Sequence, residues 1–444
     1  MVIPSASRLM TSLRDIGYTA PAAVADLVDN SIDADAATTR ITVSFRGADS
    51  FIRIADDGNG MTERVLDEAM RYGTRRRYGA ADLGRFGLGL KTASLSQCRR
   101  MTVATRSTLR GRIRIRRWDL DHVQTHDRWD LQTLTPSECP PLLLEPLRKQ
   151  IGTVVLWDRL DRMLEYAHPH GEKARKGLEA LSDEIREHLS MVFHRYLEKW
   201  NGGEQALGII FNGEPLTAWD PYALAEPGTR SLPVQRIPFD HEGKTHVVLA
   251  RPYVLPSQSR FSTPDAHALA SGPALWNRQQ GFYIYRGRRL IQSGGWNRLR
   301  TMDEHSKLAR IAIEMPSGVE EAFQINVAKM SASIPADLRP RLRALAAGIV
   351  AEAQSEYRHH QVTTEATGEG TEIEATMGAI WPTVAYVVHR ELADMPEVRR
   401  RLLLALANTR PTGVEEEPVV ALLAGVGVLE EVRPPRRGAL AAGG

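Results

Sequence analysis

The segment AVADLVDNSIDADA, Ala23–Ala36, combines an apolar helical face with several acids and one asparagine. The sequence predicts a helix from Pro21 to Asp35, because proline is favoured in a first helical turn and the apolar residues recur at the spacing of a buried face. On that helix Asp26 and Asn30 project from one side. Taken alone, the pattern is typical of an exposed acidic face. A carboxylate beside a carboxamide is also suited to a general base and a magnesium ligand.

The second informative segment is IADDGNGM, Ile54–Met61, which directly follows a predicted strand that begins at Phe51. Asp-Asp-Gly-Asn-Gly is an ordinary turn sequence. A carboxylate at a strand end can also accept a hydrogen bond from the exocyclic amine of a base, and the glycines would let the backbone approach a flat ring. The segment is therefore consistent with a simple turn or with a nucleobase site.

The third segment, LGRFGLGLKTAS, Leu83–Ser94, places three glycines ahead of a predicted helix that begins near Leu90. A glycine-rich turn that leads into a helix forms an anion site from backbone N–H groups and the helix dipole. The dinucleotide fingerprint is matched only superficially, because the βαβ unit and the later ribose-binding acid are missing. No G-x-x-x-x-G-K-[ST] motif occurs, so a nucleotide site here is not of the P-loop type.

Short β-like runs alternate with helical stretches, and most neighbouring runs are only a few residues apart, which favours antiparallel pairing. We therefore expect an α+β fold with helices on one face of a mixed β-sheet. A long amphipathic helix, Gly177 to Trp200, precedes a second strand-rich block that ends in a helix from Leu338 to Tyr357. Acid-rich linker composition follows, and then a short helical tail. The expected divisions are residues 1–201, 202–358, 359–376 and 377–444.

The charge of the chain is unevenly distributed. The 444 residues carry a net charge of +3, but Arg71 to Arg117 contain fourteen Lys or Arg and one acid. This block has a local charge of +13, so the remaining residues carry −10. Such a block indicates an anionic partner, which can be nucleotide phosphates, nucleic acid or an acidic face of the same protein; a solvated surface is the other interpretation.

The composition is that of an ordinary soluble protein, with 42% hydrophobic and 25% charged residues. The longest uncharged apolar run near the end is too short to span a bilayer, and the N-terminal residues lack an apolar core of signal-peptide length. The two cysteines, Cys98 and Cys139, cannot form a disulfide framework. We therefore expect a cytoplasmic protein without a membrane partner.

The order and spacing of these motifs resemble the GHKL ATPase superfamily, which includes gyrase B, the ninety-kilodalton heat-shock chaperone, histidine kinases, and the MutL and MORC proteins. The resemblance is closest to bacterial MORC-like and MutL-like members, through DLVDNSIDA, DDGNGM and GRFGLGLK. A fourth element is GTVVLWDRL, where the family places a threonine beside the adenine. The resemblance covers about Met1 to Asn201 and implies a Bergerat-fold domain that binds ATP and Mg²⁺.

Carried over to this sequence, the resemblance makes Asp26 the general base, although the family has glutamate there, and makes Asn30 the magnesium ligand. It makes Asp56 the partner of the adenine amine and Met70 to Leu83 a mobile lid. The shorter aspartate reduces the reach by about 1.5 Å; hydrolysis is then either sustained by a compensating shift or bridging water, or slow or absent. The other expected nucleotide-binding residues are Asp33, Gly58, Gly60, Met61, Gly84, Arg85, Phe86, Gly87, Leu88, Gly89, Leu90, Lys91 and Thr153.

The second strand-rich block resembles the α/β transducer domain of the family, in which a lysine at a strand end reaches the γ-phosphate. The matching segment, QINVAKMSASIP, has Lys329 as its only lysine, and YIYRGRRLIQSGGW, Tyr283–Trp296, resembles the preceding MORC-like segment. A cation there would stabilise the charge of a phosphoryl-transfer transition state. This resemblance spans about Gly203 to Tyr357.

The resemblance implies an ATPase that works as a switch, closing its lid and forming a homodimer with ATP, in a DNA-transacting system such as restriction, phage defence or DNA repair. Other subunits encoded alongside are expected partners. The arginines of RGRIRIRR together with Arg286, Arg288 and Arg289 are candidates for contacting DNA phosphates. Two alternatives stay open: a chaperone-like remodelling ATPase, whose client binding would not depend on salt, and a non-hydrolysing scaffold, which the aspartate at position 26 keeps possible.

Overall fold

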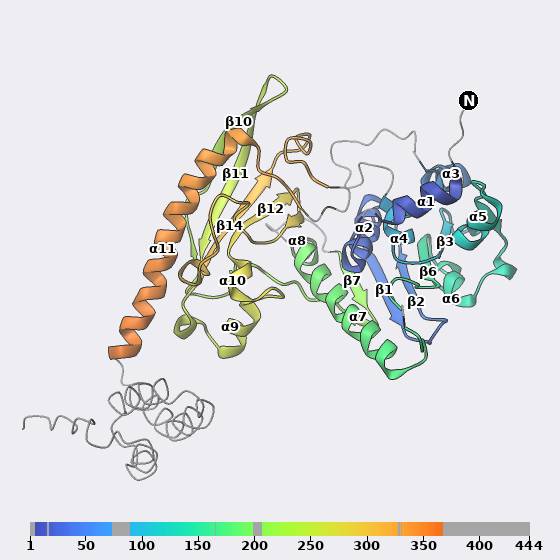
Figure 1. The fold of residues 1–444 in the computed structure, drawn as a ribbon, viewed down its shortest axis with the longest axis horizontal. Helices are drawn as coiled ribbons and strands as arrows, with labels where there is room; N and C mark the ends of the chain where they lie inside the picture. The colour runs from blue at the N-terminus through green and yellow to red at the C-terminus, as the bar shows by residue number, and fades with distance from the viewer. Residues whose placement is uncertain are drawn as a thin grey trace, which may run out of the picture. The chain divides into compact units, whose positions relative to one another are not determined.

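The computed structural model describes residues 5–15, 17–72, 89–164, 166–198, 207–326, 329 and 331–366. The chain divides into the units Met1–Glu356 and Tyr357–Gly444. The described elements belong to the first unit, except that the last helix runs on into the second. Within the first unit, two β-sheets and their helices can be followed along the chain in Figure 1.

The first sheet has eight strands among the described residues, in the order β5-β4-β3-β6-β2-β1-β7-β8. All neighbours pair antiparallel except β1 and β7, which are parallel. The predicted antiparallel pairing and the mixed character of the sheet are therefore confirmed. The strands are β1 Thr38–Ser44, β2 Phe51–Asp56, β3 Arg100–Arg106, β4 Arg114–Asp119, β5 Gln132–Leu134, β6 Gly152–Asp158, β7 Gly208–Phe211 and β8 Glu214–Pro215.

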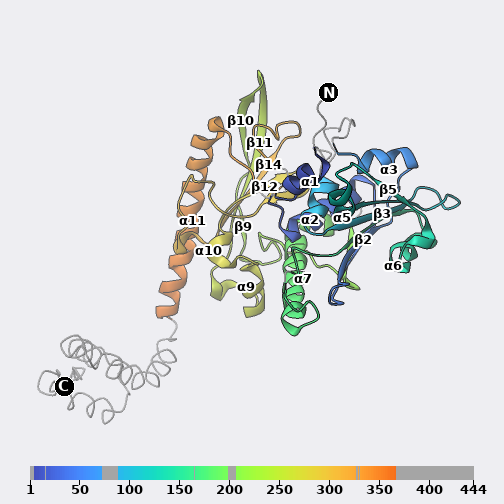
Figure 2. The same cartoon turned by 45° about the vertical axis from the view of Figure 1, so that its right-hand side comes forward.

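Most helices of this layer cover one face of the first sheet, as Figure 2 shows for α1, α2 and α7. Strand alternation explains the two faces, because Ile52 and Ile54 join the core under these helices. Phe51 and Ala55 point to the other face, which α6 and a short 3₁₀ turn partly cover, so the helices are not confined to one face as expected. The helices are α1 Ala6–Arg14, α2 Ala20–Asp33, α3 Glu63–Met70, α4 Gly89–Leu95, α5 Leu120–His126, α6 Pro141–Leu144, α7 Glu172–Val192 and α8 His194–Leu197.

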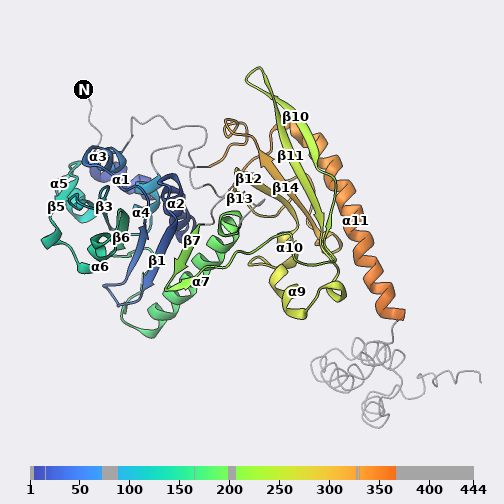
Figure 3. The same ribbon diagram turned by 180° about the vertical axis from the view of Figure 1, so that it is seen from behind.

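The second sheet has six described strands, in the order β10-β11-β14-β12-β13, with β9 paired to β11. It is also mixed, because β12 and β14 run parallel while the other pairs are antiparallel. Helix α11 runs alongside β10 and β11 (Figure 3). The elements are β9 Arg230–Ser231, β10 Gln235–His241, β11 Lys244–Val254, α9 Pro264–Ala270, α10 Leu275–Gln279, β12 Gly281–Arg286, β13 Arg289–Gln292, β14 Ala309–Met315 and α11 Arg339–Ala366.

Several boundaries differ from those expected. Strands β7 and β8 complete the first sheet, since β7 pairs with the edge of β1, so this layer extends past the expected limit at Asn201. The long helix is interrupted at Phe193, between α7 and α8. Residues 324–326, which precede the lysine expected at a strand end, form a turn and irregular backbone. Helix α11 continues to Ala366, into the expected linker, and the expected tail lies outside the described residues.

Candidate functional site

Helix α2 carries the acids on which the site is built. It begins as the sequence predicts, with the Thr19 side chain accepting a hydrogen bond from the Ala22 N–H and with Pro21 in the first turn. Asp26 and Asp29 are buried, with side chains 3% and 0% exposed, whereas Asn30 is exposed. The exposed acidic face suggested by the pattern alone is therefore wrong for the two aspartates. Asp33 is exposed as well.

The Asp26 carboxylate has a different environment at each oxygen. Its Oδ2 accepts a hydrogen bond of 2.7 Å from the Tyr18 hydroxyl. Its Oδ1 lies 3.1 Å from Lys329 Nζ, an ion pair without hydrogen-bond geometry, and no other described group forms a hydrogen bond with this atom. Burial, opposed mainly by the charge of Lys329, raises the pKa of Asp26. Asp26 thus has one oxygen held by a hydrogen bond and the other directed to a cation.

Asp29 is held by two cations from the second strand-rich block. Lys329 Nζ donates to its Oδ2 at 2.7 Å, and Arg289 Nε donates to its Oδ1 at 2.9 Å. Burial alone would raise the pKa of Asp29, but the charges of Arg289 and Lys329 outweigh burial and lower it. Burial alone would lower the pKa of Lys329, and the two aspartates instead raise it. Two carboxylates and two cations therefore form a buried cluster with balanced charge.

Lys329 is the residue expected to reach a γ-phosphate, and the structure brings it to Asp26 and Asp29 at the expected general base. Its backbone adopts a left-handed conformation, with φ of 50°. This conformation is uncommon for a residue with a side chain. The backbone N–H donates to the carbonyl of Asn326. The two expected catalytic residues, Asp26 and Lys329, therefore lie together, although they are far apart in the sequence.

Asp56 ends β2 and is fixed by the backbone around it. Its Oδ1 accepts hydrogen bonds of 3.0 Å from the N–H groups of Gly58 and Thr153. Its Oδ2 lies 3.4 Å from the hydroxyl of Ser31 on α2. Burial raises the pKa of Asp56 to about 6. A buried carboxylate with an oxygen that has only a long contact is suited to accept a hydrogen bond from a base amine.

The glycines near Asp56 lie against other backbone of the same protein, whereas the sequence suggested an approach to a flat ring. Gly60 has φ of 63°, and a Cβ there would lie 2.2 Å from the carbonyl oxygen of Arg106. A Cβ on Gly58 would lie 2.6 Å from the carbonyl oxygen of Ala34. Such separations are far below ordinary contact distances, so side chains are excluded at both positions. The hydroxyls of Thr105 and Thr153 lie 3.1 Å apart, and the Met61 N–H donates to Thr105.

Helix α4 follows the glycine-rich segment, and its first residue packs against α2. A Cβ on Gly89 would lie 3.0 Å from Asp26 Oδ2. Lys91 is 1% exposed and its Nζ donates to the carbonyl of Ala69 at 2.8 Å, while burial lowers its pKa to about 8. Leu90 is half-buried. Other expected residues lie outside the described part of the chain, namely Gly84, Arg85, Phe86, Gly87 and Leu88, with residues 73–83 of the expected lid.

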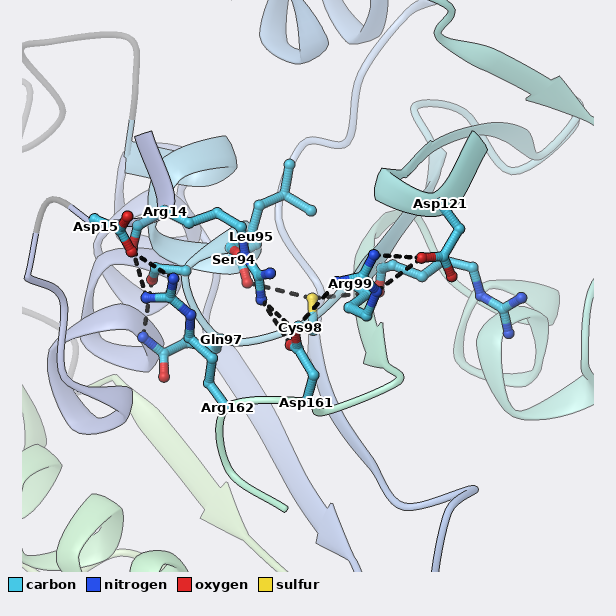
Figure 4. A network of polar contacts seen from close by, with 12 residues as sticks. Arg14, Asp15, Ser94, Leu95, Gln97, Cys98, Arg99, Asp121, Asp161 and Arg162 are labelled. Atoms are coloured by element: carbon cyan, nitrogen blue, oxygen red, sulfur yellow. Dashed lines mark hydrogen bonds and ion pairs between the residues drawn. The ribbon is translucent and has the colours of Figure 1, made fainter. Parts of the chain in front are cut away.

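Five of the ten described basic residues in the arginine-rich block form ion pairs with acids of the same protein. Arg99 contacts Asp121 at 2.5 Å and lies 3.6 Å from Asp161, and Figure 4 shows it in this network. An acidic face of the same protein, one of the interpretations left open, therefore accounts for much of the block. Exposed Arg110 and Arg112 make no ion pair with another described residue. Further pairs are Arg100–Asp158 at 2.5 Å, Arg116–Asp67 at 2.7 Å and Arg116–Glu63 at 3.1 Å.

Two of the three arginines expected to contact DNA from the second block, Arg286 and Arg289, are wrong candidates because they are buried in ion pairs. Arg286 is 9% exposed and pairs with Glu320 at 2.8 Å, and Arg289 is 2% exposed on Asp29. Arg288 donates to the carbonyl of Arg195. Arginine side chains that are buried and satisfied in this way support the fold instead of presenting charge to a phosphate backbone.

Sequence reasoning missed Tyr18, Ser31 and the role of Asp29. Asp29 carried a signal, because it stands among apolar residues of the helix and a buried carboxylate requires a cation or several donors. The sequence did not identify that cation, because Arg289 is far from Asp29 along the chain. Tyr18 precedes the predicted helix in a segment with no periodic pattern, so no sequence feature pointed to its hydroxyl.

Residues 18–153 match a family model described as histidine kinase-, DNA gyrase B- and HSP90-like ATPase. No curated protein gives a significant match to the chain. In the described residues, no group of His, Cys, Asp and Glu side chains forms a metal cluster, and no helix is long and apolar enough to cross a membrane. The family match, together with the mixed α+β layer and the acids of α2, supports placing residues 18–153 in the GHKL superfamily of ATPases.

Proposed function

We propose that the chain is a Mg²⁺-dependent ATPase of the MORC-like or MutL-like kind, in which ATP drives formation of a homodimer in a DNA-transacting system such as phage defence, restriction or repair. The observation that carries the proposal is the contact between Lys329 and Asp26, because it joins the second sheet's block to the expected base. Lys329 belongs to the second strand-rich block and contacts an expected nucleotide-binding acid of the first layer. Such a contact can make the position of the second block depend on whether nucleotide is bound.

The residues present fit ATP and Mg²⁺. Asp56 Oδ2 has only a long contact, 3.4 Å from the Ser31 hydroxyl, and is the acceptor for the adenine amine. Asn30, exposed one helical turn after Asp26, offers a carboxamide oxygen of the kind that Mg²⁺ accepts while it keeps several waters. Bound Mg²⁺ would neutralise phosphate charge.

In the proposed reaction, Asp26 Oδ1 takes a proton from water as the water oxygen bonds to the γ-phosphorus and the bond to the β-phosphate oxygen breaks. The products are ADP and inorganic phosphate, and the proton leaves Asp26 to solvent. Phosphate oxygens compete with Asp26 and Asp29 for Lys329, so binding of ATP weakens the carboxylate contacts of this lysine. The position of the second block thereby becomes sensitive to nucleotide.

The main alternative is a scaffold that binds ATP without hydrolysis. Two observations favour this alternative: aspartate is one methylene shorter than the family's glutamate, and its Oδ1 is buried against Lys329. Phosphate release measured with and without duplex DNA separates the two functions. We expect wild-type turnover, its loss in Asp26→Asn and Asn30→Ala, and retained ATP binding in Asp26→Asn. Glu352→Gln, at an exposed surface pair, is the matched control.

If Asp26→Asn hydrolysed ATP at the wild-type rate, Asp26 would be excluded as the general base. ATP binding without turnover in the wild type would establish the scaffold instead. Dimerisation is tested separately by size-exclusion chromatography with a non-hydrolysable ATP analogue. A monomer at every protein concentration would exclude the ATP-driven dimer.

A further inference from the structure

Tyr18 is held between two helices of the site. It precedes α2, its side chain is 7% exposed, and its carbonyl accepts a hydrogen bond of 2.9 Å from Gln97 Nε2. The hydroxyl at the other end donates to Asp26 Oδ2 at 2.7 Å. Because the backbone carbonyl, the buried ring and the hydroxyl of Tyr18 are all held, the hydroxyl defines one position for the Asp26 carboxylate.

Thr92 of α4 continues this chain of hydrogen bonds. Its side chain is 1% exposed and hydrogen-bonds the Tyr18 hydroxyl. A tyrosine hydroxyl can accept one hydrogen bond while it donates another. With Tyr18 donating to Asp26, Thr92 is the donor to Tyr18. Helix α4 is therefore connected through two hydroxyls to the expected base.

Tyr18 and Gly89 surround Oδ2 of Asp26, which leaves Oδ1 as the oxygen that can act as the base. Oδ2 accepts from Tyr18 and faces Gly89, whose built Cβ would lie 3.0 Å from it. Oδ1 has the ion pair with Lys329 and no hydrogen bond from a described group. A short side chain in the place of a glutamate has less reach, so the orientation of Oδ1, which faces Lys329, matters more.

We propose that Tyr18 is a positioning residue for ATP hydrolysis: its hydroxyl, itself oriented by Thr92, holds Asp26 so that Oδ1 receives the proton of the attacking water. This inference rests on the proposed ATPase function. It assigns Tyr18 no contact with ATP, so loss of the hydroxyl affects the chemical step and leaves nucleotide binding in place.

The test measures kcat, KM and the Kd of a non-hydrolysable ATP analogue for Tyr18→Phe, Thr92→Val and Thr92→Ser. We expect Tyr18→Phe to lower kcat about tenfold to a hundredfold, part of the contribution of a well-placed base. KM and Kd should stay within about threefold. Thr92→Val should lower kcat less, and Thr92→Ser, which keeps the hydroxyl, should restore it. Tyr253→Phe, a buried tyrosine of β11 in a separate core cluster, is the matched control and should match the wild type.

Two results would overturn the inference alone, given a wild type that hydrolyses ATP. One is wild-type kcat in Tyr18→Phe. The other is a fall in kcat accompanied by an equal loss of analogue affinity and of the unfolding midpoint, which would make the hydroxyl merely structural. Absence of turnover in the wild type would instead refute the proposed hydrolysis, and this inference with it.

Discussion

Replacing Asp29 by asparagine tests the buried charge cluster directly. The substitution keeps the shape of the side chain and removes the negative charge that Arg289 and Lys329 share. Asp29 is fully buried and Arg289 is 2% exposed, so solvent cannot compensate for the missing charge. We expect the variant to be markedly less stable than the wild type, with the loss arising at the contact between α2 and β13.

The size of the effect follows from the burial of the pair. Removing one partner of a buried ion pair destabilises a protein by about 3–5 kcal/mol, because the other charge is left uncompensated. Lys329 keeps its contact with Asp26 at 3.1 Å, which offsets part of the loss. Arg289 retains the carbonyl of Leu290 at 2.5 Å and the ring of Phe193. We therefore expect Asp29→Asn to lower the free energy of unfolding by about 3 kcal/mol, the lower end of the range.

Urea unfolding followed by tryptophan fluorescence measures this difference. A loss of about 3 kcal/mol lowers the midpoint by about 1 M if the slope is about 3 kcal/mol per molar. The matched control is Glu352→Gln, since its partner Arg230 is exposed and such a pair contributes about 1 kcal/mol at most. The double variant Asp29→Asn, Arg289→Met removes both charges. Its loss in free energy of unfolding should be smaller than the sum of the losses in the two single variants.

An Asp29→Asn midpoint indistinguishable from that of Glu352→Gln would refute the reasoning. So would strict additivity in the double variant, because it would mean that Arg289 and Asp29 do not interact. The pH dependence adds a check of sign. The lowered pKa of Asp29 contributes stability above the unfolded value of about 3.9, so the difference from wild type should shrink as the pH falls below that value.

Two further predictions concern Asp56 and the exposed arginines. The pKa of Asp56 is raised to about 6, so stability should fall as the pH rises from about 4 to 6. Asp56→Asn should therefore stabilise the nucleotide-free protein at pH 7, by up to about 3 kcal/mol. The same variant should bind an ATP analogue about tenfold or more weakly. An affinity equal to that of the wild type would exclude the contact between Asp56 and adenine. Arg110→Ala with Arg112→Ala should leave DNA-free ATP turnover unchanged and reduce the salt slope of DNA binding by about 2. An unchanged salt dependence of DNA binding would exclude Arg110 and Arg112 as DNA contacts.

The sequence was most informative where local rules decide the structure. The helix expected from Pro21 to Asp35 is observed as Ala20–Asp33, since proline and a recurring apolar stripe are local signals. The strand expected to begin at Phe51 is observed as β2, and it pairs with β6, which contains Thr153. Asp56 could be chosen because a strand end followed by glycines fixes a carboxylate through its own backbone, a geometry that needs no distant partner.

Sequence reasoning failed where the outcome depends on distant pairing. Strand β7 lies in what the sequence indicated as a second strand-rich block, but alternation of apolar residues does not say which sheet a strand joins. Arg289 was expected to contact DNA phosphates, but it is buried on Asp29, a partner far away along the chain. The density of arginines likewise indicated an anion without identifying it as Asp121 or Asp158.

The two cations that reach α2 differ in how easily phosphate can replace their present partner. Arg289 is 2% exposed and has contacts besides Asp29, with the carbonyl of Leu290 and the ring of Phe193, so releasing it would leave several groups unsatisfied. Lys329 contacts two carboxylates through one flexible side chain and stands on a left-handed backbone. A phosphate can take over the role of both carboxylates for Lys329 but cannot replace the surroundings of Arg289. In the proposed switch, Arg289 therefore remains on Asp29 as the permanent connection between the two sheets, and Lys329 is the group that exchanges its partner when ATP binds.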